Sequence, residues 1–97
     1  MIPVARLGDR TIGYCKCHKK IFKGTIVSAS SDHKVNNLGV ARLGDMILSD
    51  CGHTAKIITA SSLTITNNLG TARLGDKGEG ACYTCKIITA SPDTFTN

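Results

Sequence analysis

The sequence predicts an all-β fold of short strands and tight turns, in which three repeats close around a pseudo-threefold axis. Two observations carry this prediction: two segments each recur three times in the same order, and the residues around them are β-branched or turn-forming. The first segment, Val-Ala-Arg-Leu-Gly-Asp, occupies Val4–Asp9 and Val40–Asp45 and, with Thr as its first residue, Thr71–Asp76. The second occupies Ile26–Ser31, Ile57–Ser62 and Ile87–Pro92. Because the residues at both ends belong to repeats, we expect a closed ring and not an open ladder with capped ends.

Strands are expected where β-branched residues gather. The segment Ile57–Thr66 is rich in them and alternates between apolar and polar residues from Leu63 onward, which predicts a half-buried strand; Thr94–Thr96 repeats that alternation. Turns are expected at each Asn-Asn-Leu-Gly and Leu-Gly-Asp, because Asn and Gly accept positive φ and Asp can bond backbone N–H groups just downstream. We therefore expect the repeated Arg and Asp to hold turns and not to catalyse a reaction.

The net charge of +5 is concentrated in one segment. Copy one is longer than the others because it contains a basic loop, Arg10–Gly24, that has no acidic residue. Its basic residues are Arg10, Lys16, Lys19, Lys20 and Lys23. Elsewhere seven basic residues balance seven acidic ones. Two interpretations are open: a solvated loop, or a contact with an anionic surface.

The small size of the chain predicts a stabilising cross-link. With 97 residues, two Tyr, two Phe and no Trp, the chain buries only a modest core, so a metal, disulfides or a partner is expected to hold it. The first repeat follows Met1 at once, leaving no room for a signal peptide, and no apolar run reaches the roughly 20 residues of a membrane helix. We expect a soluble protein that folds in a cytoplasm, where thiols with nearby His residues favour metal ligation over disulfides.

The cysteine spacing predicts a metal site. Asp9, Asp45 and Asp76 are each followed six positions later by a Cys, and equivalent positions of a closed ring converge on its axis. Three thiolates and His53 would complete a tetrahedron that suits a structural Zn²⁺. The predicted ligands are Cys15, Cys51, His53 and Cys82, with Cys17, His18 and Cys85 as alternates. The other interpretation is that the thiols only fill a poor core. His33 lies opposite Thr64 and Thr94 of the other copies and is expected at the surface.

No catalytic motif accompanies this site. The single Glu, Glu79, lies between two glycines and is expected in a mobile turn, where it would make a poor general base. The chain contains no nucleophile elbow, no phosphate-binding Gly-rich loop and no His-x-Glu deaminase signature. We expect a protein that is not an enzyme.

Together the repeat, the Cys spacing and the size resemble the PAAR-repeat proteins, the spike tips of contractile injection machines, and most resemble a small phage tail-spike tip. The Pro-Ala-Ala-Arg motif of that family is matched by Pro3–Arg6, Gly39–Arg42 and Gly70–Arg73, and its Gly-Ser-Pro by Ala90–Pro92. Two of the three motifs lack Pro, and Cys15 stands where the family more often has His. The resemblance covers essentially the whole chain.

The resemblance implies one PAAR-repeat domain over residues 1–97, with repeats at about 3–38, 39–69 and 70–97, folded as a small metal-stabilised cone. It implies Zn²⁺, or another transition metal such as iron, near the apex, held by Cys15, Cys51, His53 and Cys82. The base of the cone would sit on the blunt end of a trimeric β-helical spike. The expected function is to cap and sharpen that spike for envelope piercing.

The expected location is therefore the virion, at the tip of the tail spike of the baseplate after assembly in the host cytoplasm. The alternative is a bacterial cytoplasm followed by delivery through type VI secretion. The expected partners are the spike and, transiently, the target envelope, without nucleic acid or a small-molecule substrate. One rival is a zinc-stabilised basic nucleic-acid-binding module, which would bind with strong salt dependence. Another is a metal-dependent hydrolase or effector toxin.

Overall fold

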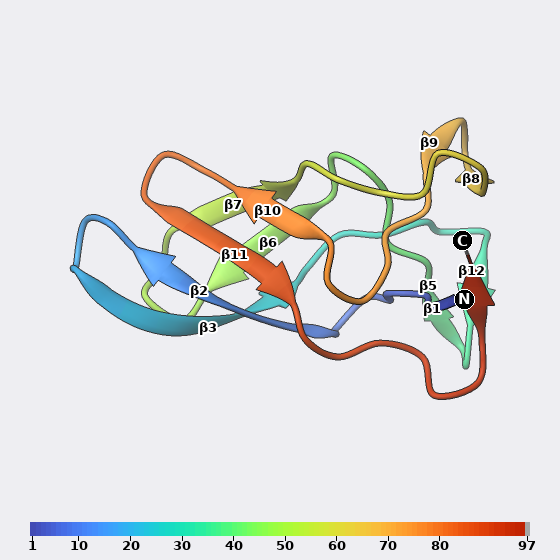
Figure 1. Ribbon diagram of the computed structural model, residues 1–97, viewed down its shortest axis with the longest axis horizontal. Helices are drawn as coiled ribbons and strands as arrows, with labels where there is room; N and C mark the ends of the chain where they lie inside the picture. The colour runs from blue at the N-terminus through green and yellow to red at the C-terminus, as the bar shows by residue number, and fades with distance from the viewer. Residues whose placement is uncertain (97) are drawn as a thin grey trace.

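The structure, a computed structural model, describes residues 1–96. This part of the chain is all-β, with short strands and no helix, as the sequence predicts. It therefore holds no helical segment of the length and apolarity needed to cross a membrane. The molecule is elongated, with principal extents of 34 × 24 × 22 Å. Three hairpin turns lie towards one end of the long axis, and both termini lie at the other (Figure 1).

Six strands form a closed antiparallel barrel made of three hairpins, one from each repeat. The hairpins are β2 (Arg10–Cys15) with β3 (Lys20–Ile26), β6 (Met46–Ser49) with β7 (Thr54–Ile57), and β10 (Lys77–Glu79) with β11 (Tyr83–Ile87). Adjacent hairpins pair through β3 with β6, β7 with β10 and β11 with β2, which leaves no free strand edge in the barrel.

Three two-stranded sheets lie at the opposite end. They are β4 (Lys34–Val35) with β5 (Leu38–Gly39), β8 (Ile65–Thr66) with β9 (Leu69–Gly70), and β1 (Ile2–Pro3) with β12 (Phe95–Thr96), which joins the two ends of the chain. The two Asn-Asn turns have φ between 52° and 64° at Asn36, Asn37, Asn67 and Asn68. That left-handed geometry suits a tight hairpin, so the turns predicted at Asn-Asn-Leu-Gly are confirmed.

A ring of hydrogen bonds joins the repeats between these two ends. The Ala5 N–H donates to the Ala72 carbonyl (3.0 Å), the Ala72 N–H to the Ala41 carbonyl (2.9 Å), and the Ala41 N–H to the Ala5 carbonyl (3.0 Å). All three alanines are fully buried. Each repeat therefore donates one bond and accepts one bond at the same position of its sequence, and the small side chain leaves the backbones room to approach.

The repeated Arg and Asp hold turns, as predicted. In the second repeat, the buried Asp45 accepts hydrogen bonds from the backbone N–H of Arg42 (2.8 Å) and from its Nε and Nη2 (both 2.9 Å). The same bonds recur between Arg6 and Asp9 and between Arg73 and Asp76. Gly44 has φ of 89°, a conformation that strains other residues, which explains the Leu-Gly-Asp motif.

Each of these aspartates also ties its repeat to the preceding one. Ser28 donates to Asp45 (3.0 Å), Thr59 donates to Asp76 (2.9 Å) and, across the chain ends, Thr89 donates to Asp9 (2.9 Å). The apolar core lies inside the barrel around Ile26, Ile47, Ile57, Ile87 and Tyr83, all with 1% or less exposure. Because the apolar core is small, these hydrogen bonds between repeats are important for holding the repeats in place.

Three local predictions are wrong. The expected strand over Ile57–Thr66 is broken, because β7 ends at Ile57 and Ser61 Oγ accepts the N–H groups of Leu63 (3.2 Å) and Thr64 (3.0 Å), which folds the chain into a turn. The basic loop Arg10–Gly24 is the β2–β3 hairpin, whose lysines point outward. Glu79 lies in β10, opposite Thr84 and Lys56, and not in a mobile turn.

Candidate metal centre

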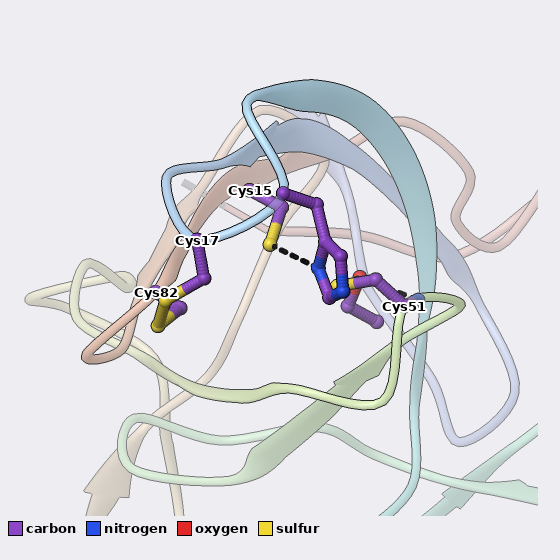
Figure 2. Close-up of a disulfide and its surroundings, with 6 residues drawn as sticks. Cys15, Cys17, Cys51 and Cys82 are labelled. Carbon is purple, nitrogen blue, oxygen red and sulfur yellow. Dashed lines mark hydrogen bonds between the residues drawn. A yellow bond between two sulfur atoms is a disulfide. The ribbon is translucent and has the colours of Figure 1, made fainter.

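Four Cys and His side chains meet at the hairpin end of the barrel. Cys15 ends β2 and His18 lies in the following turn, while Cys51 and His53 lie in the β6–β7 turn. Their sulfur and ring nitrogen atoms all lie within 4.8 Å of one another. Figure 2 shows Cys15 and Cys51 on two neighbouring hairpins, with the Cys17–Cys82 pair beside Cys15.

The β6–β7 turn presents Cys51 and His53 in a defined geometry. Gly52 has φ of 94°, and its N–H donates to the Ser49 carbonyl (2.9 Å). Ser49 Oγ accepts the Cys51 N–H (3.2 Å) and lies 2.9 Å from the Cys51 sulfur. The Ser49 N–H in turn donates to the His53 carbonyl (2.8 Å). A glycine is needed here because another residue would be strained at that φ.

The two imidazole rings pack against each other. Their centroids are 5.3 Å apart at 51°, and the His18 ring also makes an edge contact with Phe22 at 5.8 Å. His18 Nδ1 lies 3.2 Å from the Cys15 sulfur, close enough for a hydrogen bond. His18 is therefore oriented by a thiol on one side and by aromatic rings on the other.

The hydrogen bonds at Cys51 make its thiol more acidic than an ordinary cysteine. Burial raises the pKa of the Cys51 thiol, but hydrogen bonds from the Ser49 hydroxyl, the His53 backbone and the Cys15 thiol outweigh that effect, so the pKa lies below its ordinary value. A thiolate is the form of cysteine that binds a metal. Cys85 differs, because burial raises its pKa and its side chain lies in the core of the barrel.

The structure brings together three of the four residues that were predicted as metal ligands. Cys15, Cys51 and His53 come together, but the fourth member of their group is His18, which was an alternate. Cys82 forms a disulfide with Cys17, across turns 65 residues apart in the chain and with Cα atoms 5.4 Å apart. The disulfide departs from the expectation that the thiols remain free for metal. Cys85 is not brought to the group, and His33 is exposed at the other end, as predicted.

This donor set could hold a metal ion. Two sulfur and two nitrogen ligands suit a tetrahedral ion, whose ligands at about 2.0–2.3 Å would lie roughly 3.3–3.8 Å from one another. The four ligand atoms are within 4.8 Å already, so they would need to move inward by only a small distance. The chemistry of the donors and their spacing therefore fit a structural site with all four positions filled by the protein.

The opposite end of the molecule carries a cavity of about 250 Å³. It is lined by residues from equivalent positions of the three repeats: Val4, Val40 and Thr71; His33, Thr64 and Thr94; Val35, Thr66 and Thr96. Phe95, which lines the cavity, is exposed, and so are Leu63 and Ile65, the sequence neighbours of the cavity residue Thr64. The turns next to Cys15 and Cys51 and the strands β4, β8 and β12, which contribute to the cavity wall, lie at opposite ends of the elongated molecule (Figure 1).

Comparison with protein-family models finds no match to this chain, and comparison with curated proteins finds no similar sequence.

Proposed function

We propose that this protein is a PAAR-like spike tip that caps the blunt end of a trimeric β-helical spike and is the first part of the machine to enter a target envelope. One observation carries the proposal: the end that holds the termini surrounds its cavity with equivalent residues from three repeats. A pseudo-threefold surface of one chain can meet a true threefold trimer with the same contacts at each subunit. The cyclic bonds of Ala5, Ala41 and Ala72 support that symmetry.

The chemistry of this end suits docking onto a β-helix. The three short sheets β1–β12, β4–β5 and β8–β9 have free edges, to which strands of a spike can add, which removes exposed edges from both proteins. Ile65 and Phe95, at 55% and 44% exposure, would become buried in such a contact. This end is therefore the proposed base, and the hairpin end is the proposed apex of a cone.

The proposed role of the metal is structural. A Zn²⁺ ion held by Cys15, His18, Cys51 and His53 would join the end of β2 and the β2–β3 turn to the β6–β7 turn at the apex. Metal binding adds directly to folding free energy, which would resist splaying of the hairpins under load. No ligand position is left for a substrate, so the proposed site is not catalytic.

The alternative function, a zinc-stabilised nucleic-acid-binding module, rests on four exposed lysines of the β2–β3 hairpin: Lys16, Lys19, Lys20 and Lys23. It predicts DNA binding whose logarithm falls linearly with the logarithm of salt concentration. A spike tip would use the same lysines against anionic headgroups of an envelope. Serine at all four positions would weaken DNA binding in the first case and leave spike binding unchanged in the second.

The test of the proposal is binding to the trimeric β-helical spike protein of the organism that supplies this sequence. We expect Ile65→Lys and Phe95→Lys each to weaken the affinity about tenfold or more, because each places a charge in a buried contact. The matched control is Ile21→Lys, which adds the same charge at a 71% exposed apolar position of β3. Wild-type affinity of both base variants, or an equal loss with Ile21→Lys, would contradict the proposed docking face.

A further inference from the structure

A second group of metal-binding side chains adjoins the first. The ligand atoms of Cys17, His53 and Cys82 lie within 4.8 Å of one another, and His53 belongs to both groups. Cys17 is exposed and Cys82 is partly exposed, so a reductant from solvent can reach their disulfide. The pair lies directly beside Cys15 in Figure 2. This end of the molecule thus contains six potential Cys and His ligands, and two of them, Cys17 and Cys82, cannot bind metal while they form a disulfide.

The two cysteines stay close to each other without the disulfide. The turns that carry them follow β2 and precede β11, which pair along their length from Thr11 with Ile87 to Cys15 with Tyr83. The Lys16 N–H also donates to the Cys82 carbonyl (2.6 Å). Because backbone bonds hold the turns together, reduction would release two thiols at nearly the same positions.

We propose that Cys17, Cys82 and His53 form a second metal site that is controlled by redox state: closed to metal in the disulfide form, and open to a thiophilic divalent ion such as Zn²⁺ when reduced. Reduction adds two electrons and two protons to the disulfide, and a phosphine reductant supplies the electrons as it becomes its oxide with oxygen from water. Metal binding then releases the two thiol protons. The site has three protein ligands, and water can fill the fourth position.

Sharing of His53 couples the two sites. A metal bound by Cys17 and Cys82 would also bind the His53 imidazole, which is a ligand in the group of Cys15, His18 and Cys51 as well. The thiol–disulfide state of the apex therefore sets how many thiolates this end of the protein can give to metal: two in the oxidised form and four in the reduced form. This inference concerns the chemistry of the apex and does not rest on spike binding.

The experiment uses Co²⁺, whose sulfur-to-metal charge-transfer absorbance reports the number of bound thiolates. Wild-type protein is titrated to saturation before and after treatment with a phosphine, which does not supply competing thiols. The absorbance per chain should rise about twofold on reduction, as thiolate ligands increase from two to four. The double variant Cys17→Ser, Cys82→Ser should give the oxidised value under both conditions. An unchanged wild-type absorbance after reduction would overturn the proposal.

A second variant separates the two sites. Cys15→Ser, Cys51→Ser removes both thiolates of the first group and keeps Cys17 and Cys82. Its charge-transfer band should be absent in the disulfide form and appear on reduction, and the added change His53→Ala should weaken the Co²⁺ affinity of that reduced form. A reduced variant without the band would contradict a site at Cys17 and Cys82. If this variant fails to fold, the comparison of oxidised with reduced wild type still decides the question.

Discussion

Replacement of Asp45 by Ala should destabilise the protein far more than loss of an ordinary surface acid. The Asp45 side chain is 7% exposed, and its two oxygens accept four hydrogen bonds, three from Arg42 and one from Ser28 of the preceding repeat. Ala leaves the Arg42 backbone N–H without its acceptor and the Arg42 guanidinium without its ion-pair partner. It also removes one of two hydrogen bonds of Ser28 to repeat two and leaves the bond from the Met46 N–H (2.8 Å).

The size of the effect follows from these contacts. Breaking a buried ion pair costs about 3–5 kcal/mol, and an unsatisfied buried donor costs about 1–3 kcal/mol. The Arg42 side chain is 21% exposed, so water can recover part of the lost solvation. We therefore expect a loss of about 3 kcal/mol, near the lower end of the buried-pair range. For a domain of this size, that corresponds to a fall in Tm of roughly 12–24 °C.

Thermal and urea unfolding monitored by circular dichroism measure this loss. The matched control is Asp50→Ala, which removes the ion pair with Arg10 at 3.1 Å, where the Asp50 side chain is 54% exposed. Such an exposed pair contributes less than about 1 kcal/mol. If Asp45→Ala lost no more stability than Asp50→Ala, the argument that the repeated Arg-Asp turns stabilise the fold would be refuted.

Three further predictions concern the ring, the pH response and the metal. Ala41→Val should lower the free energy of unfolding by about 1–3 kcal/mol, because two methyl groups are forced against a fully buried backbone ring; urea unfolding that matches wild type would contradict this. Burial raises the pKa of the Tyr83 hydroxyl above its value of about 10 in the unfolded chain. The folded state therefore keeps this proton at pH values where the unfolded chain has lost it. The resulting contribution to stability is complete below about pH 10 and is lost as the pH rises above that value. The fall in stability between neutral and alkaline pH should be smaller in Tyr83→Phe, and equal slopes for the two proteins would argue against it. A chelator should lower the Tm of metal-loaded wild type but not the Tm of Cys51→Ser. Calorimetry with and without chelator measures this difference. An equal change of Tm in both proteins would contradict the prediction.

The repeat made the turns predictable, but not the barrel strands. Turn residues have conformational requirements that act within a few residues, so Leu-Gly-Asp and Asn-Asn could be interpreted locally. The strands β2 and β3 mix lysines and glycines with a few apolar residues, and their buried positions face a core made by all three repeats. Their pairing is a long-range property, which explains why Arg10–Gly24 resembled an inserted loop.

The sequence pointed to the cysteines and histidines that gather at the hairpin end, but not to which of them pair with one another. A common offset from the repeated Asp marked Cys15 and Cys51, which the fold brings together, and also Cys82, which the fold pairs with Cys17. The three hairpins differ in length, so equal offsets do not bring the three sulfurs to one point. The longer first hairpin carries His18 to the group, and Cys17 to Cys82. In the sequence, the position of His18 three residues after Cys15 was the feature that could have identified His18 as a member of this group.

The mass of the complex with the trimeric β-helical spike tests the central claim most directly. A tip whose three repeats each meet one spike subunit through the end that contains the sheets β1–β12, β4–β5 and β8–β9 can bind only once to each trimer. Native mass spectrometry should therefore find one chain of 10.2 kDa per spike trimer, with no larger assembly as the chain is added in excess. Three chains per trimer, or no complex at all, would contradict the account.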